Sequence, residues 1–301
     1  MADFSATDAA FTGFRIVRER PMAAAVWAGL QLVISLVLGA FIVATAGPQL
    51  MALQAAAFSP PANPTAAFAM VRQLLPMYAG LLVFALIFYP ILYAAMARAV
   101  FRPAEDRFGY LRLGVDELRQ LGLMLLIIVL GFIFYVFSVL ILAVAIVVGH
   151  FAGGLASALI AAIAIVAFLV GWIFIGTRLS LASPLTFATR RVDLFGSWAL
   201  TKGKFLPIFG AYLLAVTLAV VVYLLGYAVI LGIVAATGGG AGGLAAMAHP
   251  DLASMSAFLS PPRLIQTILS AMLMALIWPV ILTPAAFIYR SLAPTAAETF
   301  D

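Results

Sequence analysis

Acidic residues are the side chains in this sequence that come closest to a catalytic or metal-binding arrangement. Two adjacent pairs occur, Glu105-Asp106 and Asp116-Glu117. Neighbouring carboxylates can act as general acid and base or bind a metal ion. Arginines interleave both pairs here, and this favours ordinary ion pairing at the protein surface. We therefore predict structural rather than catalytic roles for Asp116 and Glu117.

The two histidines, His150 and His249, do not complete a reactive site in the sequence. Only His249 has a nearby carboxylate, Asp251. A His-x-Asp pair lacks the further ligands of a metal site and the nucleophile of a catalytic triad. The chain has no cysteine, so thiolate metal sites, cysteine nucleophiles and disulfides are excluded. We expect no catalytic residue, no metal, no cofactor and no enzymatic activity.

The composition is that of an integral membrane protein. Of 301 residues, 66% are hydrophobic and 9% are charged, whereas soluble domains are about half apolar and about a quarter charged. The mean hydropathy is +1.20. No polar stretch is long enough to form a separate soluble domain. The sequence therefore predicts an all-α polytopic helical bundle that forms one integral membrane domain over residues 1–301.

Six apolar runs are long enough to cross a membrane as helices. None of them contains Asp, Glu, Lys or Arg, so ion-coupled transport lacks its usual intramembrane charge. Prolines inside such runs are expected to kink or cap the helices, because neighbouring helices satisfy the freed backbone groups. The predicted spans cover residues 22–46, 76–97, 120–148, 155–177, 206–236 and 264–289.

The basic residues are concentrated in alternate segments between the predicted spans. Three precede the first span, five lie in the second loop, five lie in the fourth loop and one lies in the tail, so these segments hold 14 of the 16 Lys and Arg residues. Segments rich in Lys and Arg stay in the cytoplasm. We predict a multi-pass protein with both termini in the cytoplasm.

The second and fourth loops also form a candidate surface for anionic lipid headgroups. Each Lys or Arg near a membrane surface contributes about 1 kcal/mol of attraction. The alternative is that these charges only set the topology. Expected partners are therefore membrane lipids, with a second membrane protein or a second copy of the chain as further candidates, and we expect no nucleic acid. The candidate headgroup contacts are Arg107, Arg112, Arg119, Arg190, Arg191, Lys202 and Lys204.

Three basic segments resemble one another, and each immediately precedes an odd-numbered span. They read FTGFRIVRERP from Phe11, FGYLRLGVDELRQ from Phe108 and FGSWALTKGKF from Phe195. This likeness suggests a threefold repeat of interfacial helix, span, outer turn and span. The alternative is that every cytoplasmic membrane boundary attracts aromatic residues and arginines. The sequence leaves both interpretations open.

Two of these segments carry the pattern of a short amphipathic helix lying on the membrane. In the second segment, apolar residues recur at helical spacing at Phe108, Leu111, Val115 and Leu118. Asp116 and Arg119 are spaced to pair on the same helix. In the third segment, Asp193 is a predicted N-cap for a helix within residues 193–205.

The same regions resemble known membrane proteins. The segment RPAEDRFGYLRLGVDELRQ from Arg102 resembles uncharacterised inner-membrane proteins of high-GC bacteria. The stretch from Arg178 to Phe205 resembles the membrane domain attached to some glycerophosphoryl diester phosphodiesterases and its stand-alone relatives. The resemblance implies six spans in a bacterial inner membrane. It does not imply phosphodiesterase activity, because the catalytic barrel with its metal-binding residues is not in this sequence.

The sequence thus favours a non-enzymatic bacterial inner-membrane protein that acts as a scaffold or handles lipid or another hydrophobic molecule. The outer loops at 47–75 and 237–263 are nearly uncharged and apolar, so they are expected to rest on the outer leaflet or cover a cavity. Two alternatives stay open at this point. One is a membrane-embedded enzyme acting on lipid headgroups, and the other is a small-molecule permease.

Overall fold

The computed structural model describes residues 4–58, 64–237, 240–248, 251–252 and 254–293, and all regular structure in these ranges is helical. Six helices in these ranges are long and apolar enough to cross a membrane. They are α2 (Pro21–Phe58), α4 (Leu75–Phe101), α5 (Val115–Ala152), α6 (Gly154–Leu179), α9 (Phe205–Thr237) and α12 (Pro261–Leu292). Each predicted span lies within one of them, so the prediction of an all-α polytopic membrane fold is confirmed.

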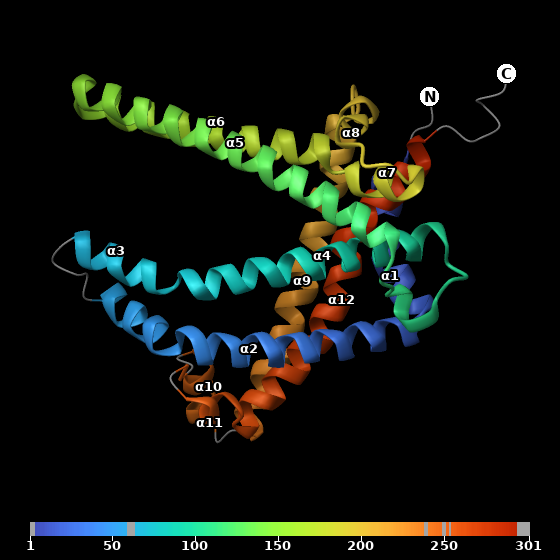
Figure 1. The fold of residues 1–301 in the computed structure, drawn as a ribbon, viewed down its shortest axis with the longest axis horizontal. Coiled ribbons are helices and arrows are strands. Elements are labelled where there is room, and N and C mark those ends of the chain that lie inside the picture. Colours follow the sequence, from blue (N-terminus) through green and yellow to red (C-terminus); the bar gives the residue numbers. More distant parts are fainter. Residues whose placement is uncertain (1–3, 59–63, 238–239, 249–250, 253, 294–301) are drawn as a thin grey trace.

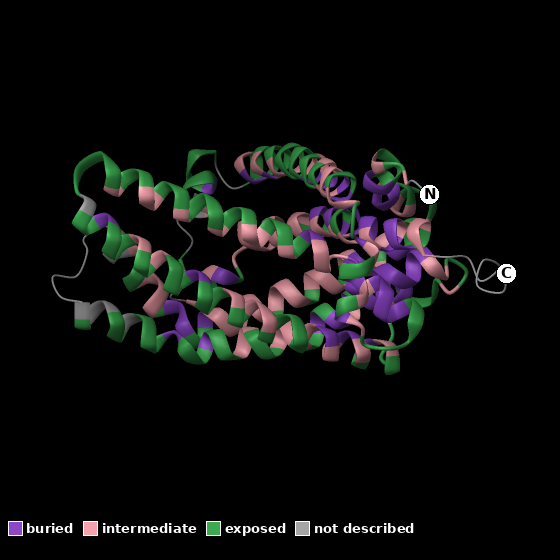
Figure 2. Cartoon of the chain, turned by 90° about the horizontal axis from the view of Figure 1, so that it is seen from above, coloured by how far each residue is buried: buried purple, intermediate pink, exposed green. Residues whose placement is uncertain are grey.

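Shorter helices lie at the two ends of the long ones (Figure 1). We call one end the collar end; it contains α1, the loop at 102–114, α7, α8 and the last turns of α12. Buried residues gather at this end, whereas the opposite parts of the long helices are mostly exposed or of intermediate exposure (Figure 2). The short elements are α1 (Ala6–Glu19), α3 (Pro64–Gln73), η1 (Arg107–Tyr110), α7 (Ala182–Thr189), α8 (Leu194–Leu200), α10 (Ala241–Ala248) and α11 (Met255–Phe258).

Helix α12 is the centre of the bundle and packs against α1, α2, α4 and α9. Small residues allow these close approaches. A Cβ atom at Gly13 of α1 would lie 2.4 Å from the backbone nitrogen of Val280, so α1 and α12 touch through their backbones. On α9, Ala211, Ala215 and Ala219 are buried at four-residue spacing. Helix α12 also contains Pro279 and Pro284 and remains continuous, as the sequence predicts.

Helices α5 and α6 form a hairpin that extends away from α12 as an arm (Figure 1). Most of its side chains are exposed and apolar on every face, which is typical of helices surrounded by lipid. The two helices approach closely at the tip, where a Cβ at Gly149 would lie 3.2 Å from the Ser157 Oγ. The arm joins the remaining helices mainly through α4 and α7.

The predicted surface helix beginning at Phe108 is wrong. Phe108, Gly109 and Tyr110 all have positive φ angles of 49°, 63° and 65°, so they form a tight left-handed turn. A helix starts only at Val115 and continues directly as α5. Phe108 and Leu111 therefore do not share a helical face with the later apolar residues.

The other two basic segments do contain the expected helices. The first is α1, and the third is α8, which begins where Asp193 caps it by accepting a hydrogen bond from the Gly196 backbone nitrogen at 2.7 Å. The second segment therefore differs from the first and the third, because it begins with a turn and not with a helix. The threefold repeat stays a prediction.

The expected outer loop at 47–75 is also mostly helical. Helix α2 continues through Pro48 to Phe58, and α3 follows before α4. The residues after Pro48 include Leu, Met, Gln and several Ala, which have high helix propensity. This local preference extends α2 well beyond the predicted end of the span at residue 46.

Candidate functional site

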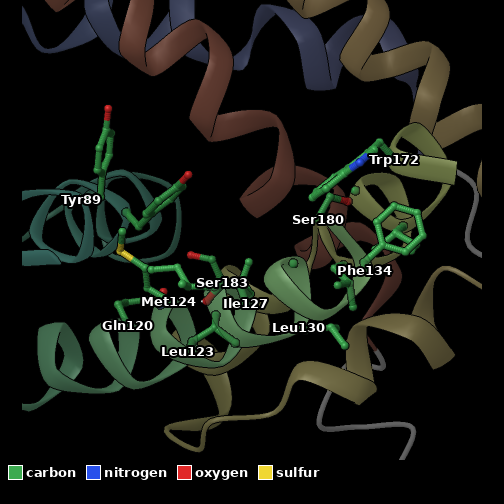
Figure 3. A pocket seen from close by; sticks show the side chains of 16 residues that line it. Tyr89, Gln120, Leu123, Met124, Ile127, Leu130, Phe134, Trp172, Ser180 and Ser183 are labelled. Carbon is green, nitrogen blue, oxygen red and sulfur yellow. Dashed lines mark hydrogen bonds between the residues drawn. The ribbon is translucent and has the colours of Figure 1, made fainter. Parts of the chain in front are cut away.

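A cavity of about 480 Å³ lies between α4, α5 and α6 and ends at α7. Figure 3 shows Tyr89 and Trp172 at opposite sides of this cavity. Tyr89 and Tyr93 come from α4, and Trp172 and Gly176 come from α6. Helix α5 supplies most of the apolar wall, with Leu123, Met124, Ile127, Ile128, Leu130, Gly131 and Phe134.

The sequence builds this wall through ordinary helical periodicity. The lining residues of α5 recur every three or four positions from Gln120 to Phe134, so they occupy one helical face. Trp172, Ile175 and Leu179 do the same on α6. No charged side chain is among the described residues that line the cavity. Its chemistry is therefore that of an apolar slot with a few uncharged polar groups.

The polar groups lie mainly at the end nearest α7. The Gln120 side chain is buried, and its amide nitrogen donates to the Ser183 carbonyl oxygen at 2.9 Å, which joins α5 to α7. The Ser180 hydroxyl donates to the Thr177 carbonyl oxygen at 2.8 Å. Its oxygen therefore remains an acceptor toward a bound molecule.

Trp172 provides a further polar atom along the apolar part of the wall. Its ring packs edge to face against Phe134, with 5.0 Å between the ring centroids. The indole nitrogen is buried and has no hydrogen-bond partner among the described residues. An unsatisfied buried donor costs about 1–3 kcal/mol. A carbonyl or ester oxygen of a bound molecule would satisfy it.

A second cavity, of about 200 Å³, adjoins the first. Tyr93, Ser180 and Ser183 line both cavities, so the two meet at these residues. The second cavity extends among α4, α7, α9 and α12, where Tyr212 is the additional polar residue. Its remaining lining is apolar and consists of Ala97, Pro184, Ile281, Leu282, Ala285 and Ala286.

A buried ion-pair network lies one helical turn beyond the polar end of the larger cavity. Arg98 is 1% exposed, and its Nη2 lies 2.7 Å from the Glu117 Oε1. Its Nη1 donates to the Tyr110 carbonyl oxygen, and its guanidinium carbon lies 5.6 Å from the centre of the Phe187 ring. The interpretation of Glu117 as a surface ion pair is therefore wrong, because Glu117 is only 5% exposed.

The other acidic residues of this region follow the sequence prediction more closely. Asp116 accepts from Arg119 at 2.8 Å, three residues away on α5. Glu105 lies 2.9 Å from Arg112, and both side chains of this pair are more than one third exposed. These contacts are consistent with structural ion pairing.

The left-handed turn is held to α2 as well as to α4. The Trp27 indole nitrogen donates to the Gly109 carbonyl oxygen at 2.7 Å. The Tyr110 hydroxyl donates to the Pro103 carbonyl oxygen at 3.1 Å. Burial raises the pKa of the Tyr110 phenol, and the nearby Arg20 lowers it by a smaller amount. The phenol therefore stays protonated and keeps donating at neutral pH.

The seven predicted headgroup residues all lie at the collar end and do not line either cavity. Two of them are engaged by carboxylates, since Arg112 pairs with Glu105 and Arg119 pairs with Asp116. Lys204 is half-buried. The other four are exposed and are Arg107, Arg190, Arg191 and Lys202. Headgroup binding by these residues stays a prediction.

The histidines do not add to the site. His150 is exposed near the end of α5, far along the arm from the collar end. His249 lies outside the described residues. Within the described part of the chain, no group of three or more His, Asp or Glu residues is arranged to hold a metal ion.

Sequence reasoning missed the residues that define the cavity, namely Tyr93, Trp172, Ser183 and Tyr212. Their helical spacing was visible, but every face of these helices is apolar, so the sequence did not distinguish a cavity wall from a lipid-facing surface. No family model, curated protein or solved structure matches the chain.

Proposed function

We propose that this chain is a non-enzymatic protein of a bacterial inner membrane, with both termini in the cytoplasm, that binds a lipid or another long hydrophobic molecule. The observation that carries the proposal is the cavity of about 480 Å³ between α4, α5 and α6. Its uncharged, mainly apolar wall suits hydrocarbon, and burial of apolar surface contributes about 25 cal/mol per Å².

The position of the cavity supports a ligand that comes from the membrane. Its walls are three helices that are each long and apolar enough to span a bilayer. A hydrophobic molecule can then move from the surrounding lipid into the cavity without passing through water. Pockets for small molecules commonly combine an apolar lining with a few polar groups that fix orientation.

The acidic residues favour a binding protein over an enzyme acting on headgroups. Glu117 is neutralised by Arg98, Asp116 by Arg119 and Glu105 by Arg112. Asp193 caps α8. A carboxylate whose oxygen atoms are occupied by such a partner is poorly placed to take a proton from a substrate. A role in binding accounts for the cavity without requiring any of these groups to react.

A cavity-filling substitution tests the proposal. Gly176 lines the cavity, and a Cβ atom there would meet nothing within 4 Å, so Gly176→Phe fills the cavity without a backbone clash. Gly232 on α9 is equally unobstructed and lies outside both cavities, which makes Gly232→Phe the matched control. The protein would be purified in mild detergent, and its retained lipids identified by mass spectrometry.

We expect the wild type and Gly232→Phe to retain one hydrophobic species at near-stoichiometric amounts. Gly176→Phe should lose most of it, because the added ring occupies the same space. Equal retention by all three proteins, or retention of bulk membrane lipid only, would contradict a specific site in this cavity.

A further inference from the structure

The smaller cavity provides hydrogen-bonding groups but no charge. Tyr212 lines it, and the Tyr212 hydroxyl is buried. Ser180 lies beside it. Among the described residues the Tyr212 hydroxyl has no hydrogen-bond partner. The Ser180 hydroxyl instead donates to the Thr177 carbonyl oxygen, so its oxygen is an acceptor. The cavity thus offers a donor at Tyr212 and an acceptor at Ser180.

Charged headgroups find no counterion in this space. Neither cavity has a charged side chain among its described lining residues. Arg98 follows the lining residue Ala97, but Glu117 and the Tyr110 carbonyl already engage it. Arg178 precedes the lining residue Leu179, but its guanidinium stacks on Trp198 and contacts Thr201. Burying a phosphate without a paired cation would therefore carry a large desolvation cost.

We infer that the smaller cavity receives the polar end of the bound molecule, and that this end is uncharged and carries a free hydroxyl group. This inference rests on the proposed function, because the larger cavity would hold the hydrocarbon part of the same molecule. A hydroxyl can accept from Tyr212 and donate to Ser180 at once. The ligand class is a neutral lipid alcohol, such as a diacylglycerol or a long-chain isoprenoid alcohol, rather than a phospholipid.

Tyr93 lies where the two parts of the molecule would meet. It lines both cavities together with Ser180 and Ser183. The molecule would thus pass Tyr93 with its hydroxyl directed toward Tyr212 and its chain directed toward Trp172.

Native mass spectrometry of the full chain in mild detergent tests this inference. The probes are dioleoylglycerol, its deoxy analogue dioleoyl propane-1,2-diol, a long-chain isoprenoid alcohol and dioleoylphosphatidylglycerol. Tyr212→Phe removes only the hydroxyl and keeps the ring. Tyr223→Phe is the control, because Tyr223 is on the same helix and lies outside both cavities.

We expect wild type to bind at least one of the two lipid alcohols more tightly than the deoxy analogue and the phospholipid. Tyr212→Phe should weaken binding of that alcohol about five-fold, as expected for one lost hydrogen bond. Binding of the deoxy analogue should not change, and Tyr223→Phe should behave as wild type.

Two results would overturn the inference while the proposed function stands. One is lipid binding that Gly176→Phe abolishes but Tyr212→Phe leaves unchanged for every alcohol. The other is binding of the phospholipid that equals or exceeds binding of both alcohols. If no probe binds in a manner that Gly176→Phe abolishes, both the inference and the proposed function fail.

Discussion

Arg98 near the end of α4 and Glu117 in the first turn of α5 form a buried ion pair, with 2.7 Å between Nη2 and Oε1. The pair closes the loop that connects the two helices. Each charge also lies at the favourable end of its helix, since a cation is stabilised near a C-terminus and an anion near an N-terminus. Arg98 additionally holds the Tyr110 carbonyl, so one guanidinium organises the whole turn.

Removing one member of this pair should destabilise the protein strongly. Glu117→Gln leaves the Arg98 charge buried without its counterion, and the expected loss is about 3–5 kcal/mol. The free energy of unfolding would be measured by SDS titration in mixed micelles. The double variant Arg98→Met with Glu117→Met removes both charges and should be more stable than Glu117→Gln alone.

The Glu105–Arg112 pair is the control for this prediction. Both of its side chains are substantially exposed, so Glu105→Gln should change the free energy of unfolding by at most about 1 kcal/mol. If Glu117→Gln were as mild as Glu105→Gln, the pair would be no more buried than an ordinary surface contact.

A second prediction concerns the left-handed turn. Gly109 has φ of +63°, and an added Cβ would lie 3.1 Å from the Val26 Cβ and 3.2 Å from the Trp27 indole nitrogen. Gly109→Ala should therefore add crowding to the backbone strain and weaken the hydrogen bond from Trp27. Gly203 has φ of +75° but open space around it, so Gly203→Ala carries only the strain, about 1–2 kcal/mol.

The comparison of these two variants separates strain from crowding. We expect Gly109→Ala to be less stable than Gly203→Ala by at least about 1 kcal/mol, the typical net value of one hydrogen bond. The same unfolding titration measures both. Equal losses would mean that Trp27 does not hold this turn.

The spans and the cap at Asp193 could be predicted because they depend on local sequence. An apolar run of sufficient length forms a membrane helix wherever it lies, and an aspartate accepts from a backbone nitrogen a few residues later. The turn at Phe108 could not be predicted in this way. Its helical pattern of apolar residues is overridden by distant partners, because Trp27 and Arg98 bind the carbonyl oxygens of Gly109 and Tyr110.

The buried ion pair and the cavity could not be predicted from the sequence for a related reason. Glu117 follows Asp116 and lies two residues before Arg119, which is the pattern of a solvated helix, yet its partner Arg98 comes from another helix. The cavity wall depends on how far the α5–α6 arm stands from α4, and no residue pattern encodes that separation. Trp172 and Tyr93 became site residues only once the helices were placed in space.

A third prediction concerns orientation in the membrane. The distribution of basic residues predicts that the collar end lies in the cytoplasm. Reporter fusions at Arg107 and Arg191 should therefore behave as cytoplasmic, and fusions at Gly153 and Gly240 should behave as periplasmic. The tight turn at Gly153 and Gly154 connects α5 to α6 at the far end of the arm from Arg191. Fusions at Gly153 and Arg191 therefore test opposite sides of the membrane. A reversed pattern of reporter activity would contradict the topology.

The last prediction uses two tryptophans at different depths, Trp172 on α6 and Trp198 on α8. Trp198 on α8 stacks against the Arg178 guanidinium, with 4.9 Å from its carbon to the ring centre, and packs edge to face on Phe174. This arrangement suits the headgroup level, where an indole can contact both hydrocarbon and a cation. Trp172 precedes Arg178 by six residues, so it lies roughly 9 Å deeper at 1.5 Å per residue.

Quenching by brominated lipids in reconstituted vesicles distinguishes the two depths. Lipids brominated near the carboxyl end of the acyl chain should quench the fluorescence of Trp198. This quenching should be lost in Trp198→Phe. Lipids brominated nearer the methyl end should quench the fluorescence of Trp172. This quenching should be lost in Trp172→Phe. Strong quenching of Trp198 by aqueous iodide would instead place α8 in water, because an indole at the headgroup level is shielded by lipid. That result would remove the physical basis for α8 as a helix lying on the membrane surface.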